Sequence, residues 1–159
     1  GLEATQPLRI FFVCEGNSCR SVIAEHIFKD MLSKKGITGV DVLSRGLDVR
    51  HFATSHYTVK MMKEVYGIDV SGHVPRELNR EEGRTADLIL TMSEEQKQRA
   101  IYYGWVPPEK TFTLSGFVGE DSADEIKDPY GYQDEEYRAT ARKIERYLQI
   151  LLRKLFEES

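Results

Sequence analysis

The stretch from Ile10 to Ser21 constrains the fold of this chain most strongly. It reads IFFVCEGNSCRS, in which an apolar run ends at Cys14 and a short polar loop leads to Arg20 and Ser21. A helix-like segment follows at once, so the stretch predicts a buried strand, a tight loop and a helix N-terminus. The first N–H groups of a helix lack partners within it, and the helix dipole adds positive charge there. We therefore expect this loop to bind an anion.

Three side chains of the stretch give the expected anion site its chemistry. Arg20 offers a planar guanidinium that matches two oxygens of a phosphate. The positive field of the loop favours the thiolate of Cys14, and a thiolate beneath a phosphate is a nucleophile for phosphorus. Ser21 can donate a hydrogen bond to that sulfur. A lone cysteine in an apolar strand is more often a small buried hydrophobe, but the complete Cys-x5-Arg-Ser spacing favours the nucleophile.

The segment CEGNSCRS, from Cys14 to Ser21, resembles the signature of the low-molecular-weight protein tyrosine phosphatases. The second half of that signature is present as Asp128-Pro129-Tyr130, and the resemblance runs from about Arg9 to the end of the chain. The resemblance implies a hydrolase that removes phosphoryl groups from proteins through a phosphocysteine intermediate. It also implies that no metal and no other cofactor takes part.

The resemblance assigns roles to individual residues. Cys14 is the expected nucleophile, Arg20 the expected cation at the phosphoryl oxygens, and Asp128 the expected general acid and base. On the local signal alone, an Asp before a Pro is more often a turn residue. Asp121 and Asp124 are the competing carboxylates. The expected phosphate-binding residues are Glu15, Gly16, Asn17, Ser18, Cys19, Arg20 and Ser21.

Three further residues match family positions whose side chains brace the loop by hydrogen bonds: Asn17, Ser44 and His73. Without the resemblance, His73 would be an ordinary surface or structural histidine. The resemblance further implies a protective disulfide in some members, here between Cys14 and Cys19. The alternative is that Cys19 only packs behind the loop.

The order of apolar segments predicts an α/β fold. Strand-like runs alternate with helical patterns, which indicates a parallel sheet built from crossover connections. The expected strands are 8–13, 40–44, 86–92 and 110–114, and the expected helices are 22–32, 54–66, one from about 77, 93–102 and 134–156. Segment 115–126 is expected to be an acidic loop. The resemblance implies a three-layer αβα arrangement around a four-stranded parallel sheet of flavodoxin-like topology, with strand order 2-1-3-4.

Length and composition limit the remaining interpretations. A chain of 159 residues is expected to form a single domain, here over 8–159, after a disordered extension or tag remnant at 1–7. The net charge of −4 argues against a nucleic-acid partner and a basic membrane-binding patch. Two cysteines form neither a secreted disulfide framework nor a zinc ligand set, which favours a cytoplasmic protein. We expect a monomer or weak dimer that acts on a phosphorylated protein.

Residue 18 bears on the choice of substrate. The tyrosine-phosphatase branch of the family commonly has an apolar residue there and the protein-arginine phosphatase branch has Thr, whereas this chain has Ser18. A phosphotyrosine ring requires an apolar slot, for which Phe52, Tyr130 and Tyr132 are candidate walls. Phosphoarginine requires polar groups and an acidic partner such as Asp128. The family favours phosphotyrosine, phosphoarginine is the alternative, and a phosphate-binding module without turnover is a third interpretation.

Overall fold

The computed structural model describes residues 6–119 and 125–157. Residues 1–5 of the expected N-terminal extension lie outside these ranges. Asp121 and Asp124, the carboxylates expected to compete with Asp128, also lie outside them.

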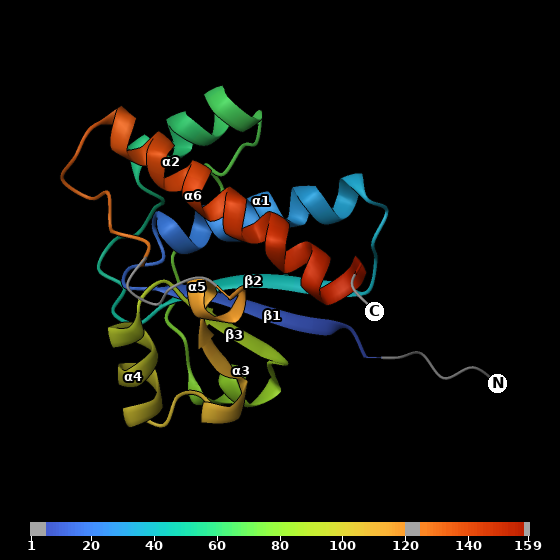
Figure 1. Ribbon diagram of the computed structural model, residues 1–159. Helices are drawn as coiled ribbons and strands as arrows, with labels where there is room; N and C mark the ends of the chain where they lie inside the picture. Colours follow the sequence, from blue (N-terminus) through green and yellow to red (C-terminus); the bar gives the residue numbers. More distant parts are fainter. Residues whose placement is uncertain (1–5, 120–124, 158–159) are drawn as a thin grey trace.

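A four-stranded, all-parallel sheet forms the centre of the molecule (Figure 1). Its order is β2-β1-β3-β4, which confirms the predicted topology. In register, Cys14 pairs with Gly46 and Val13 pairs with Thr91, so three strands end together at one edge of the sheet. The strands are β1 (Leu8–Cys14), β2 (Val40–Gly46), β3 (Leu88–Thr91) and β4 (Thr111–Thr113).

Helices cover both faces of the sheet, because the side chains of β1 alternate between two cores. Ile10 and Phe12 pack with α1 (Arg20–Lys34) and α6 (Asp134–Leu152), while Phe11 and Val13 face the other core. The remaining helices are α2 (His56–Met61) with its continuation η1 (Met62–Tyr66), α3 (Arg80–Thr85), α4 (Glu94–Tyr102), η2 (Pro108–Lys110), α5 (Leu114–Phe117) and η3 (Arg153–Glu157). Among the described helices, none is long and apolar enough to cross a membrane.

Two predicted boundaries were wrong for reasons of capping. The expected acidic loop at 115–126 begins as the short helix α5, because the hydroxyl of Thr113 accepts a hydrogen bond from the N–H of Gly116 at 2.9 Å. The helix expected from about Glu77 begins only at Arg80. There the side chain of Asn79 accepts from the N–H of Glu82 at 2.8 Å.

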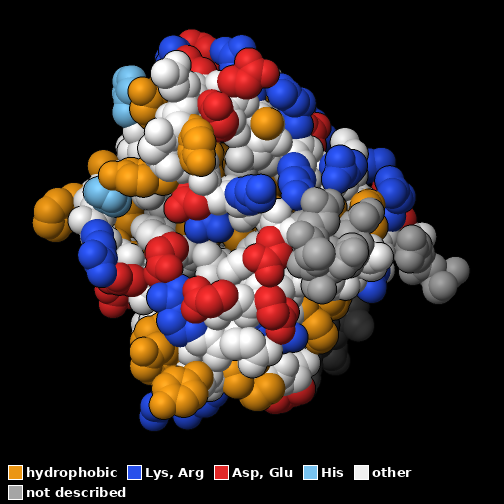
Figure 2. Space-filling view, turned by 60° about the vertical axis from the view of Figure 1, so that its left-hand side comes forward, with side chains coloured by type: hydrophobic (Ala, Val, Ile, Leu, Met, Phe, Trp, Pro, Cys, Tyr) orange, Lys and Arg blue, Asp and Glu red, His pale blue; other side chains and the backbone are white. Residues whose placement is uncertain are grey.

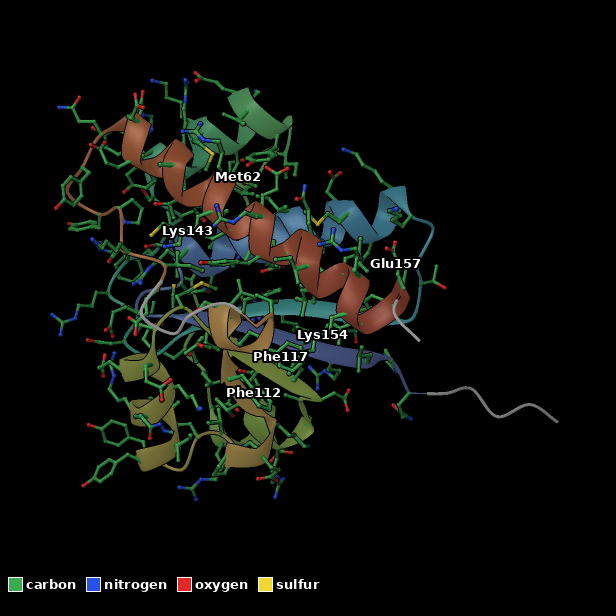
Figure 3. The ribbon with its side chains drawn as sticks, viewed as in Figure 1. Met62, Phe112, Phe117, Lys143, Lys154 and Glu157 are labelled. Carbon is green, nitrogen blue, oxygen red and sulfur yellow. The ribbon has the colours of Figure 1, made fainter. Side chains whose placement is uncertain are left out.

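Helix α6 and its continuation η3 hold Phe117 and Glu125, which lie between β4 and Asp128 in the chain (Figure 3). The ammonium of Lys154 donates to the carbonyl of Phe117 at 2.7 Å and lies 4.7 Å from the centre of its ring. Further along the chain, the ammonium of Lys143 donates to the carbonyl of Glu125 at 2.9 Å. These contacts attach Phe117 to η3 and Glu125 to α6.

Both ends of the described chain lie at the edge of the sheet opposite to the carboxyl ends of the strands (Figure 1). The N–H of Leu8, at the start of β1, donates to the carbonyl of Gly39 just before β2. Glu157 at the end of η3 lies 3.4 Å from the ammonium of Lys35, which follows α1. The loops at the other edge are therefore distant from both ends.

Candidate active site

The loop between β1 and α1 is built as an anion cradle. It spans residues 15–19, and Asn17 adopts a left-handed conformation with φ 52°. In the described chain, no backbone carbonyl accepts a hydrogen bond from the N–H groups of residues 15–18. These donors and the first turn of α1 provide partial positive charge for an anionic ligand.

Cys14 lies at the base of this cradle. Its sulfur is 3.0 Å from the hydroxyl oxygen of Ser21, and either atom can be the donor. The second cysteine of the loop, Cys19, is a free thiol like Cys14. Burial, together with the nearby Cys14 and Asp128, raises the pKa of Cys19, so its thiol stays protonated and donates to Asp128 Oδ1 at 3.6 Å.

Arg20 brings the loop and the distant Asp128 together. It is only 6% exposed, and its Nη1 donates to the carbonyl of Ile126 at 3.1 Å. Its Nη2 lies 3.6 Å from Asp128 Oδ2. Its Nε is buried and has no hydrogen-bond partner among the described residues. A buried guanidinium with an unused N–H is suited to an anionic oxygen.

Hydrogen bonds from backbone N–H groups hold Asp128 beside the phosphate loop. The N–H of Ile126 donates to the carbonyl of Met92, directly after β3, at 3.3 Å. The N–H of Tyr130 donates to Asp128 Oδ1 at 3.0 Å. The expected catalytic set of Cys14, Arg20 and Asp128 is therefore brought to one place.

The structure also brings together the residues expected to brace the loop. The amide Nδ2 of Asn17 donates to Ser21 Oγ at 2.8 Å and to Ser44 Oγ at 2.9 Å. Its Oδ1 accepts from the backbone N–H of Arg76 at 3.0 Å and lies 3.0 Å from His73 Nε2. These four contacts hold Asn17 in its left-handed conformation.

Glu25 extends this network and was missed in the sequence. Ser44 Oγ donates to Glu25 Oε1, and Lys29 donates to Glu25 Oε2, both at 2.5 Å. Although burial opposes the charge of Glu25, these hydrogen bonds lower its pKa. Burial lowers the pKa of His26 and of His73. The sequence signal that could have indicated a role for Glu25 is its position between apolar residues of α1.

A cavity of about 430 Å³ opens over the cradle. Above the phosphate loop, the residues that line the cavity are polar or charged, apart from Tyr130. They include an ion pair between Glu15 and Arg99 at 2.6 Å and one between Asp48 and Arg50 at 2.8 Å. Figure 2, which turns this side of the molecule forward, shows acidic and basic side chains intermixed on it. The cavity is lined by Cys14, Glu15, Gly16, Ser18, Cys19, Arg20, Asp48, Arg50, His51, Arg99, Asp128 and Tyr130.

Comparison with known proteins shows which protein family has this sequence and fold. The sequence profile described as "Low molecular weight phosphotyrosine protein phosphatase" matches residues 9–159. The chain belongs to this family. A protein-arginine-phosphatase of Geobacillus stearothermophilus is 34% identical over 152 residues, covering 96% of this chain and 99% of that protein. A low molecular weight protein-tyrosine-phosphatase of Acinetobacter johnsonii is 32% identical over 137 residues, covering 86% of this chain and 89% of that protein.

Solved structures of the family share the fold. A low molecular weight protein tyrosine phosphatase from T. tengcongensis matches with a TM-score of 0.87 and 34% identity, over 93% of this chain and 99% of that one. A cysteine-to-serine mutant of the YwlE arginine phosphatase matches with a TM-score of 0.88 and 30% identity, over 95% and 97%. Its active-site serine is phosphorylated, which indicates a phosphoenzyme intermediate in the family.

Two of the expected wall residues of this phosphatase lie elsewhere. Phe52 is 97% exposed and lines a neighbouring hollow that shares Ser18, His51 and Tyr130 with the main cavity. Tyr132 is 60% exposed and is not among the residues that line the main cavity. For Phe52 the reason is that the loop after β2 places Asp48, Arg50 and His51, rather than Phe52, against the cradle.

Other wall residues of the phosphatase were missed because they meet the loop only in three dimensions. Arg99 comes from α4 and pairs with Glu15, and no local pattern links two residues so far apart in the chain. Asp48, Arg50 and His51 follow β2, and their position after a strand on the carboxyl edge was the one available signal.

Gly46 allows the phosphatase loop to lie against the end of β2. A Cβ at this position would lie 2.9 Å from the carbonyl oxygen of Glu15 and 3.0 Å from backbone atoms of Gly16 and Asn17. We expect Gly46→Ala to displace the loop by a few tenths of an ångström and to lower kcat/KM by about tenfold. Steady-state kinetics with p-nitrophenyl phosphate measures this.

The matched control for this substitution is Gly72→Ala. Nothing lies within 4 Å of a Cβ there, so we expect near wild-type kinetics. Equal rates for Gly46→Ala and Gly72→Ala would show that the contact between Gly46 and the loop does not set the loop geometry.

Proposed function

We propose that this phosphatase removes phosphoryl groups from protein side chains through a phosphocysteine at Cys14. The observation that carries the proposal is the convergence of the Cys14 sulfur, the Arg20 guanidinium and the Asp128 carboxylate at one cavity. In the first step, Cys14 attacks phosphorus while Asp128 protonates the leaving atom. In the second step, Asp128 takes a proton from the water that hydrolyses the phosphocysteine.

The loop supplies the charge that the transition state requires. The N–H groups of residues 15–20 and the guanidinium of Arg20 are placed to stabilise the three phosphoryl oxygens. Ser21 hydrogen-bonds the sulfur and supports it as the leaving group of the second step. The donors are already fixed by the Asn17 network, so little reorganisation is needed during the reaction. These residues account for the chemistry without a metal or cofactor.

The cavity wall favours phosphoarginine as the substrate. A guanidinium carries positive charge and several N–H donors, so it requires acceptors near the phosphorus site. Glu15, Ser18, Asp48 and Asp128 line the cavity and offer carboxylate or hydroxyl oxygens. The similarity to a protein-arginine-phosphatase supports the same conclusion.

Phosphotyrosine is the second candidate, and Tyr130 favours it. The ring of Tyr130 lies at the cavity, 6.1 Å from the ring of His51, and the two can form an edge against a flat substrate ring. The description of the family and the similarity to a protein-tyrosine-phosphatase also support this candidate.

Substituting Ser18 distinguishes the two substrates. We expect Ser18→Ile to lower kcat/KM for a phosphoarginine peptide and to spare a phosphotyrosine peptide, which changes the ratio of the two by about tenfold or more. The reason is the loss of a hydroxyl acceptor and the gain of an apolar surface. Both peptides should share one flanking sequence, and released phosphate is measured.

Ser18→Thr is the matched control, because it adds a methyl group but keeps the hydroxyl. It should retain the preference of the wild type. A wild-type enzyme that prefers the phosphotyrosine peptide, with the ratio unmoved by Ser18→Ile, would make phosphotyrosine the substrate. If the protein bound phosphate but hydrolysed neither peptide, it would be a phosphate-binding module and not a phosphatase of these substrates.

We further infer that the substrates are phosphorylated proteins of the cytoplasm and that the enzyme acts as a monomer or weak dimer. The net charge of −4 and the two free thiols support this inference over a nucleic-acid or membrane partner. Light scattering of the purified chain measures the oligomeric state.

A further inference from the structure

A group of side chains that can coordinate a metal ion lies behind the phosphate loop. Glu25 and His26 come from α1 and His73 from the connection before α3. One donor atom from each residue lies within 4.8 Å of the other two. Glu25 is only 7% exposed, and His26 Nε2 is buried without a hydrogen-bond partner among the described residues. His26 Nε2 lies 3.8 Å from Glu25 Oε2, and His73 Nδ1 lies 3.9 Å from Glu25 Oε1.

The hydrogen bonds around Asn17 determine which nitrogen of His73 carries the hydrogen. The backbone N–H of Arg76 can only donate, so the side-chain atom of Asn17 that it contacts is the acceptor Oδ1. His73 Nε2 contacts the same oxygen and must therefore carry a hydrogen. In the neutral form of His73, the lone pair of Nδ1 then faces Glu25.

We propose that Glu25, His26 and His73 bind a divalent transition-metal ion such as Zn²⁺, with water in the remaining position. Imidazole and carboxylate ligands suit Zn²⁺, Co²⁺ and Ni²⁺. Tetrahedral bonds of about 2.0–2.1 Å place ligand atoms about 3.3 Å apart, so modest side-chain rotations close the site. The hydrogen bond from His73 Nε2 to Asn17 is the outer contact that typically orients a metal-bound histidine.

In the absence of a metal ion, the ammonium of Lys29 supplies the positive charge beside Glu25. Its ammonium bonds Glu25 Oε2, the oxygen that lies nearest to His26 Nε2. Lys29 comes from the next turn of α1, and its side chain is 49% exposed, so it can turn into solvent when a metal arrives. The metal must displace the ammonium, and removing Lys29 should therefore raise the affinity for the metal.

Titration with Zn²⁺ in a chelator-competition assay tests the proposal. The full chain should carry Cys14→Ser, so that the active-site sulfur does not bind the metal. We expect one bound Zn²⁺, an affinity at least about tenfold lower after His26→Ala, and a higher affinity after Lys29→Ala. His56→Ala, an exposed histidine outside the cluster, is the matched control and should bind as the parent does.

Co²⁺ substitution adds a spectroscopic readout. The proposed ligands contain nitrogen and oxygen, so we expect d–d bands of bound Co²⁺ without sulfur-to-cobalt charge transfer. Charge-transfer bands, an unchanged affinity in His26→Ala or no bound metal would each overturn the proposal. Circular dichroism checks folding, and His26→Gln replaces His26→Ala if the latter does not fold.

Discussion

Replacing Cys14 with Ser is expected to lower turnover of p-nitrophenyl phosphate by at least about 10⁴-fold, as removal of a covalent nucleophile does elsewhere. A serine hydroxyl is a much weaker nucleophile toward phosphorus than a cysteine sulfur, so the attacking group is lost. The cradle itself remains, because its N–H donors and Arg20 do not depend on the sulfur. Inorganic phosphate should still bind with an affinity within a few-fold of wild type, as calorimetry can measure.

Cys19→Ser is the matched control for this prediction. The Cys19 thiol stays protonated and bonds Asp128, so it is not the attacking group. This variant should keep measurable turnover. Substantial turnover by Cys14→Ser would contradict the assignment of Cys14 as the nucleophile. The assignment would also fail if Cys14→Ser and Cys19→Ser both bound phosphate and lost turnover to the same extent.

Asp128→Asn is expected to slow poor leaving groups far more than good ones. Phenolate requires a proton as it leaves, whereas p-nitrophenolate is stable without one, so the general acid matters mainly for phenyl phosphate. We expect a loss in kcat/KM of about 10²- to 10⁴-fold with phenyl phosphate and a much smaller loss with p-nitrophenyl phosphate. Steady-state rates with the two substrates measure the difference.

Asp48→Asn is the control, because Asp48 is the second aspartate among the described residues that line the cavity. It pairs with Arg50 and should affect both substrates equally and weakly. If Asp128→Asn slowed both substrates by the same factor, Asp128 would not be the general acid. Selective slowing of phenyl phosphate by Asp48→Asn would transfer that role to Asp48.

The local part of the site could be predicted from the sequence because it is encoded within a few residues. The apolar run of β1, the loop and the start of α1 are contiguous, so the spacing from Cys14 to Arg20 carries its own geometry. Alternating strands and helices were likewise sufficient for the parallel sheet. Asp128, Ser44 and His73 were reached only through the family resemblance, because nothing local distinguishes them from turn or surface residues.

The remainder of the site depends on tertiary contacts that no periodicity encodes. The pairing of Arg99 with Glu15 requires α4 to pack beside the loop. Phe52 was expected to wall the pocket, but its direction follows from the backbone path after β2, which local sequence does not specify. Glu25 lies beside apolar residues of α1, and its burial is compensated by Lys29 on the next turn and by Ser44 on β2. The Lys29 pair is local in sequence, whereas the contact with Ser44 requires β2 to pack beside α1.

The placement of both ends of the described chain at the edge of the sheet opposite the pocket has a practical consequence. A protein immobilised through either end would present its catalytic mouth to the solution rather than to the support. Cys14→Ser held on a sensor surface in this way could capture phosphorylated peptides from a mixture without steric interference from the attachment. A fluorescent fusion partner would be tolerated for the same reason, so the enzyme is well suited to methods that require one end to be occupied.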